Sequence, residues 1–580
     1  MGLAMLFGPA CSALAQEGWN PFEPRGGQVK ERRPRPSEAV PSGPPLPPMR
    51  ERSWERQAPP LAAPPGSVER SELAPIMAPD NSGLPLDLWR GLDLAALEGL
   101  LAGLDLPPRS PALHQLWRRM LLSQAEPPVG APGGEHFQAL RLEALYRSGL
   151  LADMAAVLEG IAQPGPIVQT LRARRDIGLG QREAGCEAIK ALAAPSSGLP
   201  GRLKGEMQLL AGYCAAAAGD AQAAGLAAQL AREEGIDAEL PLAVLTAFGA
   251  GDKPRLSMPK QVLLLDYRFL ELLGPVDPLK VLERAEPALL AMLAGDTGGD
   301  PKMQVAAAEA ALRRNALAPE AVAEVYRRQV LAGPGVADPA SPGIDPLLRR
   351  ALFLRAADVA PTAAQRARFL RAILDDARRS GARLQTGRLV APLIAGLAPA
   401  PDLAWLTEPA IEALLVAGDI DAARRWAEAA SRWDWLALAD VVDPQRRGGR
   451  LPSLAAVADL AAHGRLAPDP LHRLATVLDA LDVDVPIPLW EAASRTPQPA
   501  GGFLPETGLL ASLAEASARK EAGRTILLAM RALGPGGPEG ANPLALGDAV
   551  RALKRVGLEA DARRVALEAL LAAWPRAAAN

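Results

Sequence analysis

The chain has 580 residues, a length that corresponds to about four domains. Hydrophobic residues make up 49% of it but aromatic residues only 4%, so the apolar side chains are mainly Ala, Leu and Val, as in close-packed helices. The net charge of -3 excludes a general attraction to nucleic acid or to an anionic membrane surface. Four histidines and three cysteines leave little material for metal or acid-base chemistry, and no cofactor is predicted.

Residues 1–15 are uncharged, small and apolar, and they end in Ala13-Leu14-Ala15 before Gln16. This pattern predicts a secretory signal peptide that is cut after Ala15, and hence a periplasmic protein. No Lys or Arg precedes the apolar stretch, although signal peptides usually carry one there. A buried N-terminal helix is the alternative, but the segment that follows is too rich in proline to pack against one.

Residues 16–83 are expected to form a disordered tether. Between residues 16 and 80 lie 15 of the 57 prolines of the chain, and proline blocks both helix and ladder hydrogen bonding. The basic residues in this stretch are interleaved with glutamates, which does not favour a nucleic-acid-binding arm.

Removal of the signal peptide leaves two cysteines, Cys186 and Cys214. Both lie in helix-like stretches that are joined by the turn PSSGLPG. Folded as an antiparallel hairpin, the two stretches bring the cysteines within about one helical turn of each other. A disulfide would suit an oxidising compartment and would stabilise the fold by about 3.5 kcal/mol on the chain-entropy model. Two buried free thiols are the alternative.

From residue 84 to the C-terminus the pattern is helical and is broken every 12 to 20 residues by Gly, Pro or Asp. The predicted fold is all-α, with candidate parts at residues 84–330, 331–442 and 443–580. The longest uncharged runs fall well short of the ~20 residues that span a bilayer, so no transmembrane segment is predicted in the mature chain.

Four segments share one form, in which an apolar helix end is followed by a Gly-containing turn and an Ala-rich second helix. They are residues 142–162, 210–233, 411–430 and 550–573. Small residues beside the turn allow two helices to approach closely, and Asp after Gly can cap the second helix. Each hairpin has one apolar face that it cannot bury alone, so the segments predict a stack of hairpins, that is, a solenoid.

The G-D-x-x-A-A form at Gly418, Asp419, Ala422 and Ala423 resembles the turn and second helix of tetratricopeptide-type repeats. It recurs at residues 219–224, without a regular 34-residue period. This resemblance implies a TPR-like superhelix that binds proteins. Residues 311–328, 349–374 and 403–430 also resemble a group of exported, Ala/Leu-rich, Pro-led bacterial proteins, a resemblance that implies no particular activity.

One cluster of aromatic and basic residues is a candidate partner-binding site. It consists of Trp426, Trp433, Trp435, Arg424, Arg425 and Arg432. Trp426 and Trp433 are seven residues apart and so share a helical face. On a concave surface they would anchor a peptide or glycan. The alternative, which we prefer, is that the rings pack between neighbouring helical hairpins as part of the core.

No catalytic motif is present, and the four histidines lack metal-ligand spacing. The predicted function is therefore a non-catalytic scaffold that binds protein or peptide partners in the cell envelope, and not nucleic acid. One alternative is a cell-wall enzyme of the lytic transglycosylase type, although its Glu-Ser motif and Tyr-rich groove are not visible. The other is a structural envelope protein that self-associates. The oligomeric state is left open.

Overall fold

A computed structural model describes residues 76–131, 134–192, 201–251, 256, 258–329, 345–446 and 449–576. Within these ranges the regular elements are 28 α-helices and short 3-10 helices, and the only β pairings are isolated bridges. The prediction of an all-α fold is confirmed. The signal peptide and most of the predicted tether lie outside the described residues.

The body of the protein begins earlier than the sequence analysis expected. Residues 76–83, which the prediction assigned to the tether, fold back on the following segment, and the backbone N–H of Ala78 donates to the carbonyl of Leu84 at 2.8 Å. Leu84, Leu88 and Trp89 are buried. The described body therefore includes the last eight residues of the predicted tether, which backbone hydrogen bonds of Ile76 and Ala78 join to the segment around Leu84.

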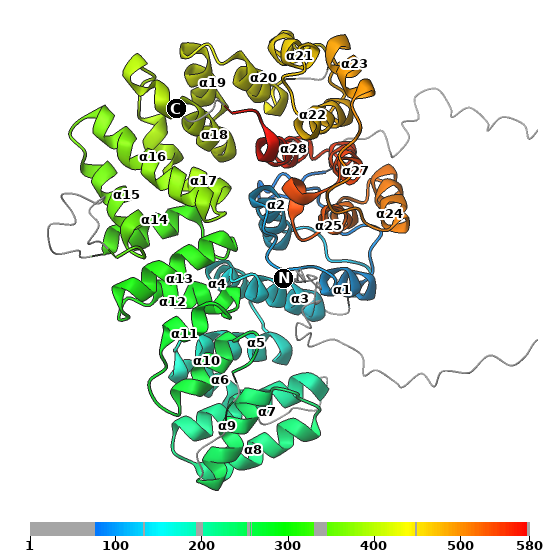
Figure 1. The fold of residues 1–580 in the computed structure, drawn as a ribbon. Helices are drawn as coiled ribbons and strands as arrows, with labels where there is room; N and C mark the ends of the chain where they lie inside the picture. The colour runs from blue at the N-terminus through cyan, green and yellow to red at the C-terminus, as the bar shows by residue number, and fades with distance from the viewer. Residues whose placement is uncertain are drawn as a thin grey trace, which may run out of the picture.

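The first third of the fold runs from α1 to α9, from the centre of Figure 1, where α1–α3 lie, to its lower end, where α7–α9 lie. Its helices are α1 (Leu94–Ala102), α2 (Pro111–Leu122), α3 (Glu135–Arg147), α4 (Leu151–Glu159), α5 (Pro166–Gly178), α6 (Arg182–Leu192), α7 (Gly201–Ala217), α8 (Ala221–Glu233) and α9 (Glu239–Ala250). Helices α7, α8 and α9 are the far end of the molecule from α21 and α23 (Figure 1).

The middle of the chain returns along the other side of Figure 1. It comprises α10 (Leu264–Glu271), α11 (Pro278–Leu282), α12 (Pro287–Gly295), α13 (Pro301–Arg313), α14 (Pro319–Arg328), α15 (Arg349–Val359), α16 (Ala363–Arg379), α17 (Arg383–Ala395), η3 (Pro401–Leu406), α18 (Thr407–Ala417), α19 (Ile420–Ala429) and α20 (Trp433–Val442).

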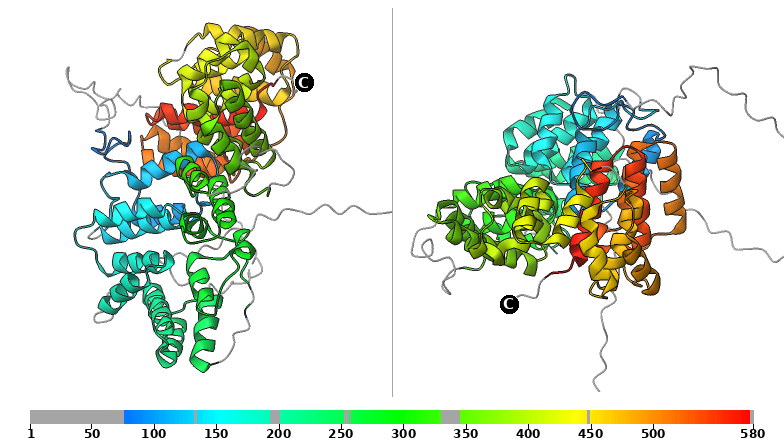
Figure 2. Two further views of the ribbon diagram at one scale, coloured as in Figure 1. Left: turned by 90° about the vertical axis from the view of Figure 1, so that its left-hand side faces the viewer. Right: turned by 90° about the horizontal axis from the view of Figure 1, so that it is seen from above.

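The last part of the chain packs back against the first helices. Its elements are η4 (Pro452–Leu454), α21 (Ala455–Ala462), α22 (Pro468–Ala480), α23 (Ile487–Arg495), α24 (Thr507–Ala518), α25 (Ala522–Leu533), α26 (Gly537–Gly540), α27 (Pro543–Arg555) and α28 (Glu559–Ala573). Figure 2 shows α1–α3 beside α25–α28 from two directions. The N–H of Gly523 donates to the carbonyl of Leu88 at 2.8 Å. The two ends of the described chain thus close on each other.

The same turn joins many successive helices. At Gly149, Gly219, Gly418 and Gly557 the backbone is left-handed, with φ between 73° and 89°. The N–H of the next residue donates to the carbonyl five positions back in all four turns, which closes the first helix and reverses the chain. Asp220 and Asp419 then cap the second helix by accepting the N–H groups of Ala223 and Ala422. The four segments that the sequence singled out are therefore helical hairpins.

One continuous apolar core extends from Leu84 to Trp574. It passes through all three of the candidate parts and is made mainly of Leu, Ala and Val, as the composition indicates. Among the described helices, none has the length and apolarity needed to cross a lipid bilayer.

Helices α6 and α7 are linked covalently. The structure joins Cys186 and Cys214 in a disulfide, with their Cα atoms 5.7 Å apart and 28 positions between them in the sequence. The bond crosslinks the two helices of one hairpin, which is the arrangement expected if the cysteines lie level on antiparallel neighbours.

A buried ion-pair cluster ties α3, α5 and α7 together. The guanidinium of Arg174 lies between the carboxylates of Glu143 and Glu206, to which it donates hydrogen bonds, and all three side chains are less than 10% exposed. The same guanidinium lies over the ring of Tyr146, 4.2 Å from its centroid. Burial raises the pKa of Glu206 to about 7, against the opposing effect of Arg174. Arg174 thus supplies one positive charge between two buried carboxyl groups.

Candidate functional site

The aromatic cluster predicted from the sequence is not exposed as a set. Trp426 and Trp435 are 2% and 0% exposed and belong to the core, whereas Trp433 is 52% exposed at the start of α20. Two of the three rings are thus unavailable to a partner. They occupy the space between packed helices, which is the alternative that the sequence analysis preferred.

Two of the three predicted arginines already have partners. Arg424 donates to Asp440 and Asp443 at 2.6 Å and 2.7 Å. Arg432 is held by one carboxylate of α18 and one of α20. Arg425 is exposed. These arginines therefore stabilise the packing of α18–α20, and the predicted anchor for a partner is not assembled at this place.

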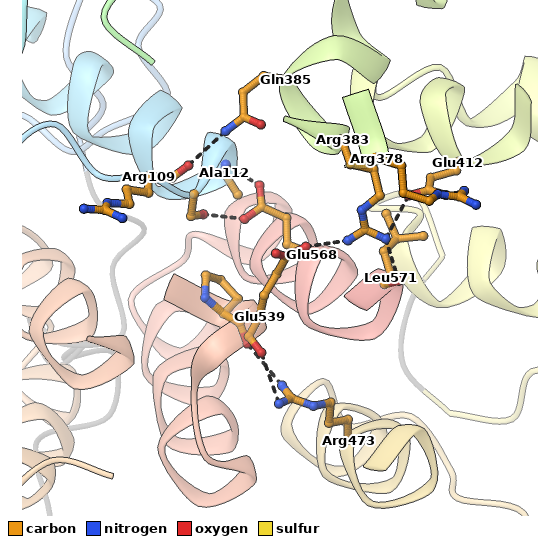
Figure 3. Close-up of polar contacts among 12 residues, drawn as sticks. Arg109, Ala112, Arg378, Arg383, Gln385, Glu412, Arg473, Glu539, Glu568 and Leu571 are labelled. Atoms are coloured by element: carbon orange, nitrogen blue, oxygen red, sulfur yellow. Dashed lines mark hydrogen bonds and ion pairs between the residues drawn. The ribbon is translucent and has the colours of Figure 1, made fainter. Parts of the chain in front are cut away.

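A large cavity lies elsewhere, where the two ends of the fold meet the middle. It has a volume of about 890 Å³. Its walls come from the loop before α2, from α11 and α12, from the end of α13, from α16 and α17, and from α26 and α28. Six arginines line it, at positions 109, 313, 314, 378, 383 and 576, together with the glutamates 283, 539 and 568. Figure 3 shows part of these walls.

One wall of the cavity has balanced charges. Glu412, 6% exposed, pairs with Arg378, Arg383 and Arg576 at 3.4 Å, 2.9 Å and 3.1 Å. Arg383 also donates to Glu539 at 2.5 Å (Figure 3). These contacts join α16 and α17 to α18, α26 and the segment after α28, and they give each of the three arginines a carboxylate partner.

The opposite wall carries Arg109 on a segment whose backbone is fixed. Asn315 donates its side-chain amide to the carbonyls of Pro108 and Arg109 at 2.9 Å and 2.8 Å. Gln385 donates to the same Arg109 carbonyl at 3.2 Å (Figure 3). The Arg109 side chain is 67% exposed, and Asp105 lies 3.9 Å from it. The structure thus presents this guanidinium from a rigid loop.

Arg313 and Arg314 stand at the end of α13 and line the same cavity. Among the described residues, neither forms a hydrogen bond or an ion pair with a carboxylate. Burial lowers the pKa of Arg314, and the positive charges of Arg109 and Arg313 lower it further, while Asp105 opposes them. Three arginines therefore line one corner of the cavity, and their one ion pair among the described residues is the 3.9 Å contact of Arg109 with Asp105.

Glu568 fastens α28 to the first turn of α2. Its carboxylate accepts the N–H of Ala112 at 2.6 Å and a hydrogen bond from the Ser110 hydroxyl (Figure 3). Ser110 is itself the N-cap of α2. Burial raises the pKa of Glu568 to about 7, against the lowering effect of the two hydrogen bonds. The cavity therefore contains a carboxyl group that titrates near neutral pH.

We expect Glu568→Gln to change how stability depends on pH. Because the folded-state pKa lies above the ordinary value of 4.5, the carboxyl destabilises the fold as pH rises from about 4.5 through 7, by up to about 1.4 kcal/mol per pH unit. The glutamine stays neutral at every pH. The melting temperature of the variant, relative to that of the wild type, should therefore be higher at pH 8 than at pH 5. Thermal unfolding at both pH values tests this, with Glu491→Gln on exposed α23 as control. An equal pH dependence in wild type and variant would contradict it.

Two further cavities continue from the first. A cavity of about 390 Å³ shares Arg109, Ser110 and Pro535 with it. A third of about 550 Å³ shares Glu506, Leu509 and Arg531 with the second. The second has apolar walls that include Leu113, Phe503 and Met530. Because neighbouring cavities share these residues, the three lie one after another along the junction of the two ends of the chain and together make a track.

Within the described ranges, no group of three His, Cys, Asp or Glu residues is arranged to hold a metal ion. The sequence analysis did not find the cavity, because its residues come from segments up to several hundred positions apart. Arg313 and Arg314 are adjacent in the sequence, and this pair is the only local pattern that could have indicated the site. No family model, curated protein or solved structure matches the chain.

Proposed function

We propose that the protein is a non-catalytic scaffold of the cell envelope that holds an extended segment of a partner protein in the three connected cavities. It would be exported by a signal peptide cut after Ala15, and its Pro-rich N-terminal segment would tether the body. The helical hairpins would be TPR-like repeats of a solenoid whose last helices close on its first. The turn that recurs at Gly149, Gly219, Gly418 and Gly557 supports that interpretation.

The observation that carries the proposal is the track of cavities along the junction of the two ends. It offers arginine side chains at both ends and apolar walls between them. An extended peptide presents charged and apolar side chains in succession, which is the chemistry that such a track can recognise. Single-stranded nucleic acid is a poor match, because Phe503 is the only aromatic residue that lines the three cavities and bases bind by stacking on aromatic rings.

Photocrosslinking in living cells tests the proposal. A benzophenone amino acid at Ala572, which lines the first cavity and is exposed, should crosslink a small defined set of envelope proteins. The same amino acid at Ala430, which is exposed at the end of α19, serves as the matched control. Absence of adducts from Ala572, or the same adducts from both positions, would contradict the proposal. Fractionation of the same cells should place the protein in the periplasm, and a cytoplasmic location would contradict the export step.

A second candidate, a cell-wall enzyme, rests on Glu568. A buried carboxyl with a pKa near 7 beside a cavity is what a general acid requires. Both of its oxygens, however, are engaged by Ser110 and Ala112 at the start of α2. Release of fragments from purified peptidoglycan, abolished by Glu568→Gln, would favour the enzyme over the scaffold.

A further inference from the structure

Two halves of the large cavity differ in charge balance. On one side, Glu412 and Glu539 neutralise the arginines of α16, α17 and the C-terminal segment. On the other, the only ion pair of Arg109, Arg313 and Arg314 among the described residues is the 3.9 Å contact of Arg109 with Asp105, although Glu283 also lines the cavity. The excess positive charge is therefore localised in one corner, formed by the loop before α2 and the end of α13.

The three arginines of this corner repel one another, although Arg109 and Arg313 are exposed and only Arg314 is half-buried. Like charges repel more strongly where protein displaces water, because the effective dielectric constant falls. The carbonyl groups at the end of α13 offset part of the repulsion. Among the described residues, no carboxylate forms an ion pair with Arg313 or Arg314, although Asp105 acts on Arg314 through space and the arginines of the neighbouring wall are all paired. The missing counter-charge points to a ligand.

We propose that Arg109, Arg313 and Arg314 bind a carboxylate of an acidic peptide segment, as the recognition element of the track. This inference rests on the proposed function, in that it names the chemistry of the partner segment. The guanidinium fork matches a carboxylate in two parallel hydrogen bonds. Asn315 and Gln385 fix the backbone that carries Arg109, so part of the site is formed before the ligand arrives.

The neighbouring cavity explains why the ligand is a peptide and not a small anion. Arg109 and Ser110 line both spaces, so a chain whose carboxylate meets the three arginines passes directly to the apolar walls around Leu113 and Met530. A segment with Asp or Glu followed by an apolar side chain fits both spaces at once. A free phosphate would occupy only the first.

Fluorescence polarisation of labelled peptides with the purified chain tests the inference. The probe is an eight-residue peptide that alternates Glu and Leu, with its C-terminus amidated, and the comparison is the same peptide with Gln for Glu. We expect the Glu peptide to bind and the Gln peptide not to bind. A Gln peptide with a free C-terminus tests whether a chain-end carboxylate suffices. Inorganic phosphate, added as competitor, should displace the Glu peptide only weakly.

The variant Arg313→Gln with Arg314→Gln should weaken binding of the Glu peptide at least about tenfold. The matched control is Arg182→Gln with Arg495→Gln, which removes the same charge from two exposed sites and should change binding less than about twofold. Without peptide, the cavity variant should also melt at a higher temperature than the wild type, because the repulsion is relieved.

Equal binding by the two double variants would overturn the inference. So would a lower melting temperature of the cavity variant, because the arginines would then support the fold. The scaffold function has its own test, which is the formation of crosslinks at Ala572. Peptide binding without crosslinks would support carboxylate binding by the three arginines and would contradict the binding of an envelope protein in the cell.

Discussion

Replacing Arg174 by leucine is expected to destabilise the fold by about 3–5 kcal/mol. The substitution leaves the carboxylates of Glu143 and Glu206 buried with no opposite charge between them. It also removes the cation above the ring of Tyr146. Equilibrium unfolding in urea, followed by far-UV circular dichroism, measures the effect. Arg182→Leu, at an exposed site on α6, serves as control and should change stability by less than about 0.5 kcal/mol.

The loss should shrink in mild acid. The folded-state pKa of Glu206 is already raised to about 7 by burial, and removal of Arg174 raises it further. A carboxyl whose pKa is raised by folding destabilises the fold only where it is ionised, so the penalty is largest at pH 8 and fades as pH falls toward 5. A pH-independent loss would show that the effect comes from packing. Replacing all three residues by apolar ones should restore much of the stability.

Removal of the Cys186–Cys214 disulfide is expected to cost about 3.5 kcal/mol. The crosslink closes a loop across 28 positions, and its loss frees the unfolded chain to explore many more conformations. Thermal unfolding of the variant Cys186→Ser with Cys214→Ser, compared with the wild type, measures the cost. Cys11 is replaced by serine in both proteins so that only one bond is compared.

Reduction supplies the control for that experiment. Dithiothreitol should lower the melting temperature of the wild type toward that of the double variant and should leave the double variant unchanged. If the reductant and the substitutions both leave the melting temperature of the protein unaltered, the disulfide does not contribute to stability.

Local features of the fold could be predicted from the sequence because they depend on nearby residues. The turn at Gly418 and Asp419 needs a left-handed residue and then a helix cap, and glycine and aspartate supply these in adjacent positions. The hairpin that carries Cys186 and Cys214 could be predicted because the sequence shows two helical stretches joined by a short turn motif. The boundary near residue 76 was missed because backbone hydrogen bonds of Ile76 and Ala78 join this Pro-containing segment to the body.

The candidate site could not be predicted, because no local pattern encodes it. Arg109 and Gln385 are 276 positions apart and meet only when the fold is complete. The cluster at Trp426 was visible because its members are neighbours in the sequence, yet the structure uses two of its rings as core. Proximity in sequence marks helix faces, whereas a cavity between distant helices depends on how those helices pack in the complete fold.

The closure of α28 on α2 has a consequence for biogenesis. Glu568 and Ala112 are 456 positions apart, so the first helices lack their packing partner until the ribosome has made nearly the whole chain. Contacts of such long range form slowly and late. For the export proposed above, this delay would be an advantage, because the N-terminal region would not complete its fold before the C-terminal region has passed through the translocation channel.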